Sequence, residues 1–148
     1  MGLCRFCQKV RQYDLLSPVV TIRGLRALRG ATSLDQDTSD EMDLKIQELF
    51  GEMVNANNLS PDDIVSVIIT ATSDIHSKFP AGSLRKLGLD DVALLGAQEI
   101  DVIGAPGLTL RILVHFESDL ERSKIKHIYL HGAKVLRADI TAKNSGQK

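Results

Sequence analysis

Arginine is the residue type that this sequence places where it can do chemistry. Arg111 stands in the middle of an otherwise apolar strand pattern, where a permanently charged guanidinium is costly unless an anion or a carboxylate meets it. Glu99 follows an apolar run and is its first candidate partner. Arg29 and Arg137 stand at the expected ends of the first and last strands, and Tyr129 supplies a hydroxyl group. The pattern predicts a pocket for a small dianion such as a dicarboxylate; the alternative is exposed strand ends with one structural ion pair.

The motifs of common catalytic machinery are absent from the sequence. It contains no GxSxG, GxxxxGK[ST] or HExxH pattern and no GxGxxG after a strand, so a standard hydrolase, kinase or dehydrogenase loses support. Cys4 and Cys7 form a lone CxxC pair without the further ligands of a zinc site, and the four histidines share no metal-ligand spacing. The sequence therefore predicts neither a metal nor a cofactor.

Length and composition are those of one ordinary globular domain. The chain has 148 residues, of which 43% are hydrophobic and 25% charged, with 18 Lys and Arg against 19 Asp and Glu. This balanced charge argues against a nucleic-acid binder and against a protein of anionic membrane surfaces. The sequence shows neither a transmembrane run nor a secretion signal, which favours a cytoplasmic location.

Hydrophobic periodicity and capping signals predict the elements that must position these residues. Residues 1–18 are expected to be a leader, 19–140 the domain and 141–148 a loosely held polar tail. The expected helices are 39–56, a short helical turn after Ser60, and 81–87. The expected strands are 19–28, ended by residues 29–32, then 64–71, 92–97, 108–117, 125–130 and 134–136.

Together these elements predict an α/β (α+β) fold, a mixed sheet of about five strands with one long helix and one or two short ones. One long helix cannot cover both faces of such a sheet. Because residues 64–71 and 92–97 are apolar on both faces, we expect other subunits to bury part of the sheet surface. The sequence therefore predicts an oligomer.

A series of short motifs also runs through the domain in a distinctive order. They are RGAT at 29–32, ATSDIHSKFPA at 71–81, QEIDV at 98–102, Arg111, IYL at 128–130 and VLR at 135–137. In order and spacing, from about residue 22 to 139, they resemble the bacterial monofunctional chorismate mutases of the AroH class. The resemblance implies a homotrimer in which the sheets of three subunits form a pseudo-α/β-barrel with active sites at the subunit interfaces.

The activity implied by this resemblance is the rearrangement of chorismate to prephenate, an isomerase step of phenylalanine and tyrosine biosynthesis. A C–O bond breaks while a C–C bond forms in one molecule, so no nucleophile, proton donor or cofactor is required. The enzyme instead holds the reactive conformer and stabilises the charge that separates. By resemblance, Arg111 donates to the ether oxygen and Glu99 meets the ring hydroxyl. Arg29 and Tyr129 match the groups that bind the carboxylates.

Two further segments complete the site that the resemblance implies. Phe79, Ala81 and Arg85 match a wall that the neighbouring subunit supplies. Leu136 and Arg137 match a C-terminal segment that closes the site. Each active site is therefore expected to contain residues of two chains, with chorismate as the small-molecule substrate.

Two glycines depart from the family pattern. Gly96 stands where the best-known members have a cysteine near the ring hydroxyl, and Gly82 stands where a lysine can sit near the pocket mouth.

The alternatives to a chorismate mutase are a trimeric enamine or imine deaminase of similar architecture and a non-catalytic trimer that binds dicarboxylates. Glu99 and the motif at 79–81 favour the mutase over the deaminase.

Overall fold

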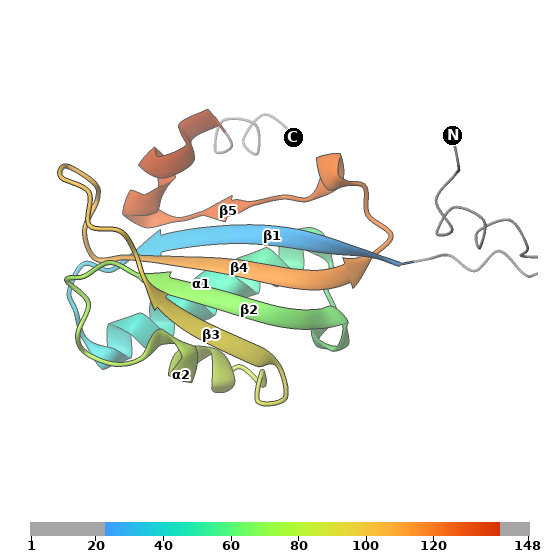
Figure 1. Cartoon of the computed structure of the whole chain (residues 1–148), viewed down its shortest axis with the longest axis horizontal. Coiled ribbons are helices and arrows are strands. Elements are labelled where there is room, and N and C mark those ends of the chain that lie inside the picture. Colours follow the sequence, from blue (N-terminus) through green and yellow to red (C-terminus); the bar gives the residue numbers. More distant parts are fainter. Residues whose placement is uncertain (1–22, 140–148) are drawn as a thin grey trace, which may run out of the picture.

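The computed structural model describes residues 23–139, and Figure 1 shows how their elements are arranged. The described chain contains five strands: β1 (Gly24–Ser33), β2 (Ile64–Ala71), β3 (Ala93–Gln98), β4 (Thr109–Ser118) and β5 (Ile128–Tyr129). Its helices are α1 (Ser39–Asn57) and α2 (Pro80–Arg85), with 3₁₀ helices at Pro61–Asp63, Arg122–Lys124 and His131–Arg137. The expected leader with Cys4 and Cys7, and the expected tail, lie outside the described residues, so the domain bounds remain a prediction.

The strands form one mixed sheet in the order β3-β2-β4-β1-β5. Strand β4 pairs antiparallel with β1 and β2, whereas β3 lies parallel to β2 and β5 lies parallel to β1. The connection from β2 to β3 passes through α2, because parallel neighbours need a crossover rather than a tight turn. The α+β class and the mixed five-stranded sheet predicted from the sequence are confirmed.

Helix α1 covers one face of the sheet because its sequence carries an apolar stripe at helical spacing. The hydroxyl of Thr38 caps the helix by accepting a hydrogen bond from the Glu41 N–H at 3.3 Å, and Asn58 ends it in the left-handed region. The buried stripe consists of Met42, Ile46, Leu49, Phe50 and Met53. It joins one hydrophobic core with the helix-side residues of the strands, including Leu28, Val67, Ile69, Leu110, Ile112, Val114 and Phe116.

The opposite face of the sheet, called the open face below, carries none of the helices α1 and α2 (Figure 1). Strand β4 shows how the two faces differ. Its residues Ile112 and Val114 point to the helix side and are buried, whereas Arg111 points to the open face and is exposed. Edge strand β3 is also largely exposed, with Leu95 61% accessible. The sequence predicts that other subunits bury part of this sheet surface, because residues 64–71 and 92–97 are apolar on both faces.

The first strand extends further than its sequence predicts. Residues 29–32 were expected to end it, but β1 continues to Ser33, and Arg29 therefore lies within the strand and pairs with Leu113 of β4. Gly30 suggested a turn in the sequence, but the structure shows that it is needed for packing against α1. A Cβ atom at Gly30 would overlap the sulfur of Met53, so the glycine lets α1 approach the sheet closely.

The end of the described chain also differs from the prediction. Of the expected strand 125–130, only Ile128–Tyr129 pairs with β1, and residues 134–136 lie in a 3₁₀ helix rather than a strand. Arg137 therefore belongs to that 3₁₀ helix and does not end a strand. His131 turns the chain at its start with a positive φ of 50°. A segment as short as Lys-Val-Leu at 134–136 does not distinguish a strand from a helical turn.

Within the described residues, none of the helices is long and apolar enough to cross a membrane.

Candidate functional site

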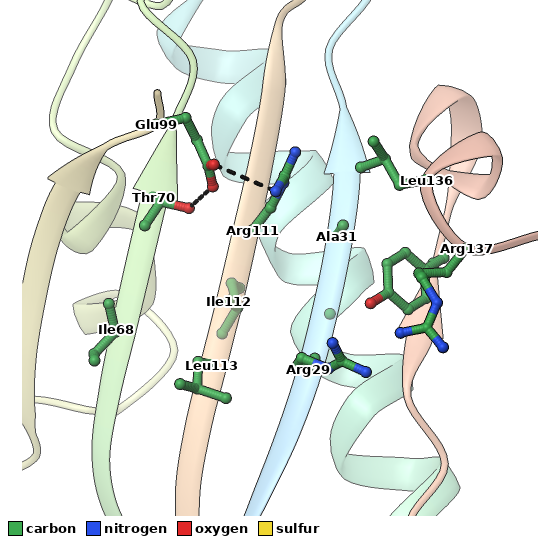
Figure 2. Close-up of a pocket in the computed structure, with 12 residues that line it drawn as sticks. Arg29, Ala31, Ile68, Thr70, Glu99, Arg111, Ile112, Leu113, Leu136 and Arg137 are labelled. Atoms are coloured by element: carbon green, nitrogen blue, oxygen red, sulfur yellow. Dashed lines mark hydrogen bonds and ion pairs between the residues drawn. The ribbon is translucent and has the colours of Figure 1, made fainter. Parts of the chain in front are cut away.

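A cavity of about 380 Å³ opens on the open face, where β2, β4, β1 and β5 meet the 3₁₀ helix His131–Arg137 (Figure 2). Strand register explains its position. One row across the sheet aligns Thr70 with Arg111, Arg111 with Ala31, and Ala31 with Tyr129. Because Ala31 has a small side chain, the larger polar groups on either side of it surround a hollow. The full lining is Arg29, Gly30, Ala31, Ile68, Thr70, Glu99, Arg111, Ile112, Leu113, Tyr129, Leu136 and Arg137.

Arg111 and Glu99 form the ion pair that the strand pattern predicts. The Glu99 Oε2 atom lies 3.3 Å from Nη1 of Arg111, and the Glu99 Oε1 atom accepts a hydrogen bond from the Thr70 hydroxyl (Figure 2). The Glu99 N–H donates to the carbonyl oxygen of Ala71 at 2.9 Å. Three contacts therefore hold Glu99, whose side chain is 18% exposed, while the Arg111 side chain is 44% exposed and faces the cavity.

Arg29 and Tyr129 lie on the opposite side of the cavity from Glu99, on the neighbouring strands β1 and β5. The backbone N–H of Arg29 donates to Nδ1 of His127 at 3.1 Å, which requires that nitrogen to be unprotonated. Burial, followed by the nearby charges of Arg29 and Arg137, holds the pKa of His127 below its ordinary value. The neutral imidazole thus ties the Arg29 backbone to the segment before β5.

Arg137 closes the cavity from the C-terminal 3₁₀ helix, together with Leu136. Its guanidinium donates two hydrogen bonds to the Asp139 carboxylate, at 2.9 Å from Nε and 2.8 Å from Nη2. This bidentate pair raises the pKa of Arg137. With Arg29 and Arg111 against Glu99, the ionisable groups lining the cavity leave a net positive charge that suits an anionic ligand.

Phe79, Ala81 and Arg85 do not line this cavity. They lie at the start of α2 and along it, where α2 packs against α1 and strands β2 and β3, and Phe79 is 88% exposed. A single chain therefore brings together six of the residues predicted for the site and leaves these three outside the cavity, with Phe79 and Arg85 exposed and Ala81 half-buried against the core. Their predicted role in a neighbouring subunit stays a prediction.

The two glycines that depart from the family pattern are not required by packing in the described chain. A Cβ atom at Gly96 would be 4.0 Å from the nearest neighbour, the Ile69 carbonyl oxygen, and one at Gly82 would meet nothing within 4 Å. Each position has room for a side chain. The loss of a side-chain contact at Gly96 and Gly82 is therefore a difference in chemistry rather than a steric necessity.

Thr70 and His127 are functional candidates that sequence reasoning missed. Thr70 looks like an ordinary strand residue, and only the pairing of β2 with β4 shows that it lies beside Arg111. His127 precedes Tyr129 by two residues, but its contact with the Arg29 backbone depends on β5 lying against β1. Both contacts join residues far apart in the sequence, so no local pattern reveals them.

The lining chemistry fits recognition of a dianion. No Ser, Cys or Lys side chain is among the residues that line the cavity, and the Thr70 hydroxyl is engaged by Glu99. The described part of the chain also contains no cluster of three or more His, Cys, Asp or Glu side chains arranged to hold a metal ion. What the cavity offers is fixed cationic donors, one carboxylate and an apolar floor, which together orient a ligand and stabilise negative charge.

Comparison with known proteins identifies the family. Residues 25–140 match the model of chorismate mutase type I. The chain is 34% identical over 118 residues to the chorismate mutase AroH of Bacillus subtilis, a match that spans 79% of this chain and 93% of that protein. It is 34% identical to the AroH of Thermus thermophilus over 117 residues, 78% of this chain and 96% of that protein.

A solved structure gives the same result. The chorismate mutase from Clostridium thermocellum superimposes with a TM-score of 0.72 at 42% sequence identity, covering 74% of this chain and 98% of that chain. The resemblance to the AroH class stated from the sequence motifs is thereby confirmed, and with it the enzyme class, an isomerase. The chain belongs to the chorismate mutase type I family.

Proposed function

We propose that the chain catalyses the rearrangement of chorismate to prephenate in the biosynthesis of phenylalanine and tyrosine. The observation that carries this proposal is the convergence of Arg29, Arg111, Tyr129 and Arg137 with Glu99 around one cavity. A substrate with two carboxylates and an ether oxygen finds there a cationic donor for each negative or developing negative charge. Family membership favours this activity over a deaminase or a non-catalytic dicarboxylate binder.

Arg111 is the proposed catalytic donor. As the ether bond lengthens, negative charge grows on its oxygen, and a guanidinium fixed beforehand stabilises that charge without reorganisation. The ion pair with Glu99 and the contact of Glu99 with Thr70 hold this donor in place. Glu99 is also the proposed partner of the ring hydroxyl.

Arg29, Tyr129 and Arg137 are the proposed carboxylate binders. Arg29 and Tyr129 extend from adjacent strands, which sets the distance between them before substrate arrives. Arg137 is paired with Asp139 in the structure, so a substrate carboxylate takes the place of the Asp139 carboxylate when it binds. Leu136 then lies over the ligand as part of the closing segment. Holding both carboxylates keeps the enolpyruvyl side chain over the ring.

A homotrimer completes this proposal. Exposed apolar side chains occur on the open face and on the loop after β3, among them Leu25, Leu95, Ile100, Val102 and Ile103. Phe79 and Arg85 are exposed, and with the half-buried Ala81 between them they supply the remaining wall of a neighbour's cavity. Sedimentation at micromolar concentration should give about three times the 16.2 kDa of the chain, and a monomer would contradict the assembly. The cytoplasmic location remains a prediction from the sequence.

Incubation of the purified full chain with chorismate tests the activity. Turnover should remove the chorismate absorbance and form prephenate, which acid converts to phenylpyruvate. Arg111→Ala serves as the inactive control and Arg122→Ala as the matched control, because Arg122 is exposed and does not line the cavity. Binding of chorismate without turnover by the unmodified chain would support the non-catalytic alternative instead.

A further inference from the structure

The segment that carries Phe79, Ala81 and Arg85 is too short to hold its own position. Helix α2 has six residues, its N-cap Phe79 makes no side-chain capping hydrogen bond, and Gly82 lies within it. A helix of this length is unstable alone, and glycine lowers its helical tendency further. Tertiary contacts must therefore determine where the exposed Phe79 side chain points.

Two ion pairs bracket this segment. Lys78 immediately precedes Phe79, and its Nζ atom lies 2.5 Å from Oδ1 of Asp43 on α1. Lys86 immediately follows Arg85, and its Nζ atom lies 2.7 Å from Oδ2 of the same carboxylate. One aspartate thus binds both ends of residues 79–85. The hydrogen bonds from Lys78 and then Lys86 hold the pKa of Asp43 well below its ordinary value, so its carboxylate is charged at neutral pH.

Further contacts attach the same segment to α1 and the core. The carboxylate of Asp37, just before α1, accepts hydrogen bonds from the backbone N–H groups of His76 at 2.7 Å and Ser77 at 3.0 Å. Leu84 of α2 is fully buried in the core. Helix α1 is long and packed against the sheet, so it forms a rigid base for the segment (Figure 1). The Asp43 and Lys78 side chains are only 26% and 20% exposed, which limits screening of their pair by solvent.

We propose that Asp43 is a positioning residue for catalysis: through Lys78 and Lys86 it fixes residues 79–85 in the orientation with which they complete the cavity of a neighbouring subunit. This inference rests on the proposed activity and on the proposed trimer. Asp43 itself touches no substrate and acts through Phe79, Ala81 and Arg85. The Asp43 carboxylate on α1 of one chain thereby helps to order the active site that residues 79–85 complete on a neighbouring chain.

Asp43→Asn tests this proposal because it removes the charge and keeps the size of the side chain. In the full trimeric protein, kcat/KM for chorismate should fall about tenfold, since a small misplacement of a site wall costs reactive geometry. Glu52→Gln is the matched control, a carboxylate-to-amide change at an exposed position of the same helix whose side chain makes no hydrogen bond or ion pair within residues 23–139, and it should stay within twofold. Lys78→Met removes the cation of the Lys78–Asp43 pair and should reproduce the loss.

A double-mutant cycle separates positioning from general destabilisation. In a chain that already carries Phe79→Ala and Arg85→Ala, Asp43→Asn should change kcat/KM by less than twofold, because the wall it positions is gone. A further tenfold loss in that background would overturn the proposal. So would unchanged kinetics of Asp43→Asn and Lys78→Met, or a lowered Tm with unchanged kcat/KM. Absence of chorismate turnover by the unmodified chain would instead contradict the proposed function.

Discussion

The two walls of the cavity are built in different ways. The β4 wall, made of Thr70, Glu99 and Arg111, consists of side chains on or directly after paired strands that contact one another across the sheet. The C-terminal wall, made of Leu136 and Arg137, lies on a 3₁₀ helix, and its arginine pairs with Asp139 only two residues along the chain. Arg111 is therefore held by contacts across the sheet, whereas the Arg137 guanidinium pairs with an acidic neighbour in sequence, a contact that a ligand carboxylate can replace.

This difference indicates a division of labour. A donor that must stabilise charge in the transition state gains from being fixed before substrate arrives, as Arg111 is. A group that captures a carboxylate can exchange one anion for another, because its interaction in the free protein and in the complex is of the same kind. Changes in the β4 wall should therefore act mainly on kcat, and changes in the C-terminal wall mainly on KM.

The largest effect is expected from Arg111→Ala. Loss of the fixed donor should lower kcat by at least about a hundredfold, as removal of one oxyanion-type donor does. Steady-state kinetics with chorismate measure this, with Arg122→Ala as the control. An unchanged kcat with a raised KM would show that Arg111 only binds substrate, and the distinction between the walls would fail.

Arg137→Ala should have the next largest effect, and this effect should be on KM rather than on kcat. Loss of a charge-assisted contact to a carboxylate should raise KM about tenfold, while kcat changes less than threefold. Lys134→Ala removes an exposed cation from the same 3₁₀ helix and serves as the control. A loss in kcat as large as that of Arg111→Ala would place Arg137 with the fixed donors.

Asp139→Asn should act in the opposite direction. The exposed Asp139 carboxylate pairs with Arg137, the proposed carboxylate binder, so its neutralisation should lower KM by about two- to threefold, in keeping with the small free energy of surface ion pairs. KM measured at low and at high salt gives a second check, since salt should reduce the difference. A raised KM would mean that Asp139 holds Arg137 in its binding orientation.

The smallest effect concerns pH and the contact between His127 and the Arg29 backbone. The pKa of His127 is lowered in the folded chain, so the unfolded chain takes up the proton more readily and stability falls as the pH drops below the ordinary histidine pKa of about 6.5. His127→Gln should reduce the loss of Tm between pH 7.5 and 5.5 by roughly 2 °C. Thermal melts at both pH values measure it, and an identical pH dependence in the variant would remove His127 from this role.

Local sequence patterns predicted those helices and strands whose position depends on residues close together in the sequence. The cap at Thr38 and the stripe from Met42 to Met53 define α1 within one residue, and the alternation around Arg111 defines β4. Glu99 as the partner of Arg111 also followed from its place after an apolar strand. These predictions succeed because capping and side-chain periodicity act over a few residues.

Predictions failed where a distant contact decides the conformation. Gly30 suggested the end of a strand, but it serves the approach of Met53, a residue 23 positions away in the sequence. Residues 134–136 suggested a strand, but they lie in a 3₁₀ helix, and of the expected strand 125–130 only Ile128–Tyr129 pairs with β1. Neither the packing of α1 nor the length of β5 is encoded within a short window.

The amino-acid sequence establishes which residues carry charge and hydroxyl groups, the period of the main helix and strand, and the motifs of the family. The folded chain is needed to show that Arg111, Ala31 and Tyr129 share one row, that Thr70 holds Glu99, and that Arg137 faces the cavity from a 3₁₀ helix. The physical reason is that composition and periodicity are local properties of a chain. The cavity, in contrast, depends on strand register, which is set by packing across the whole sheet.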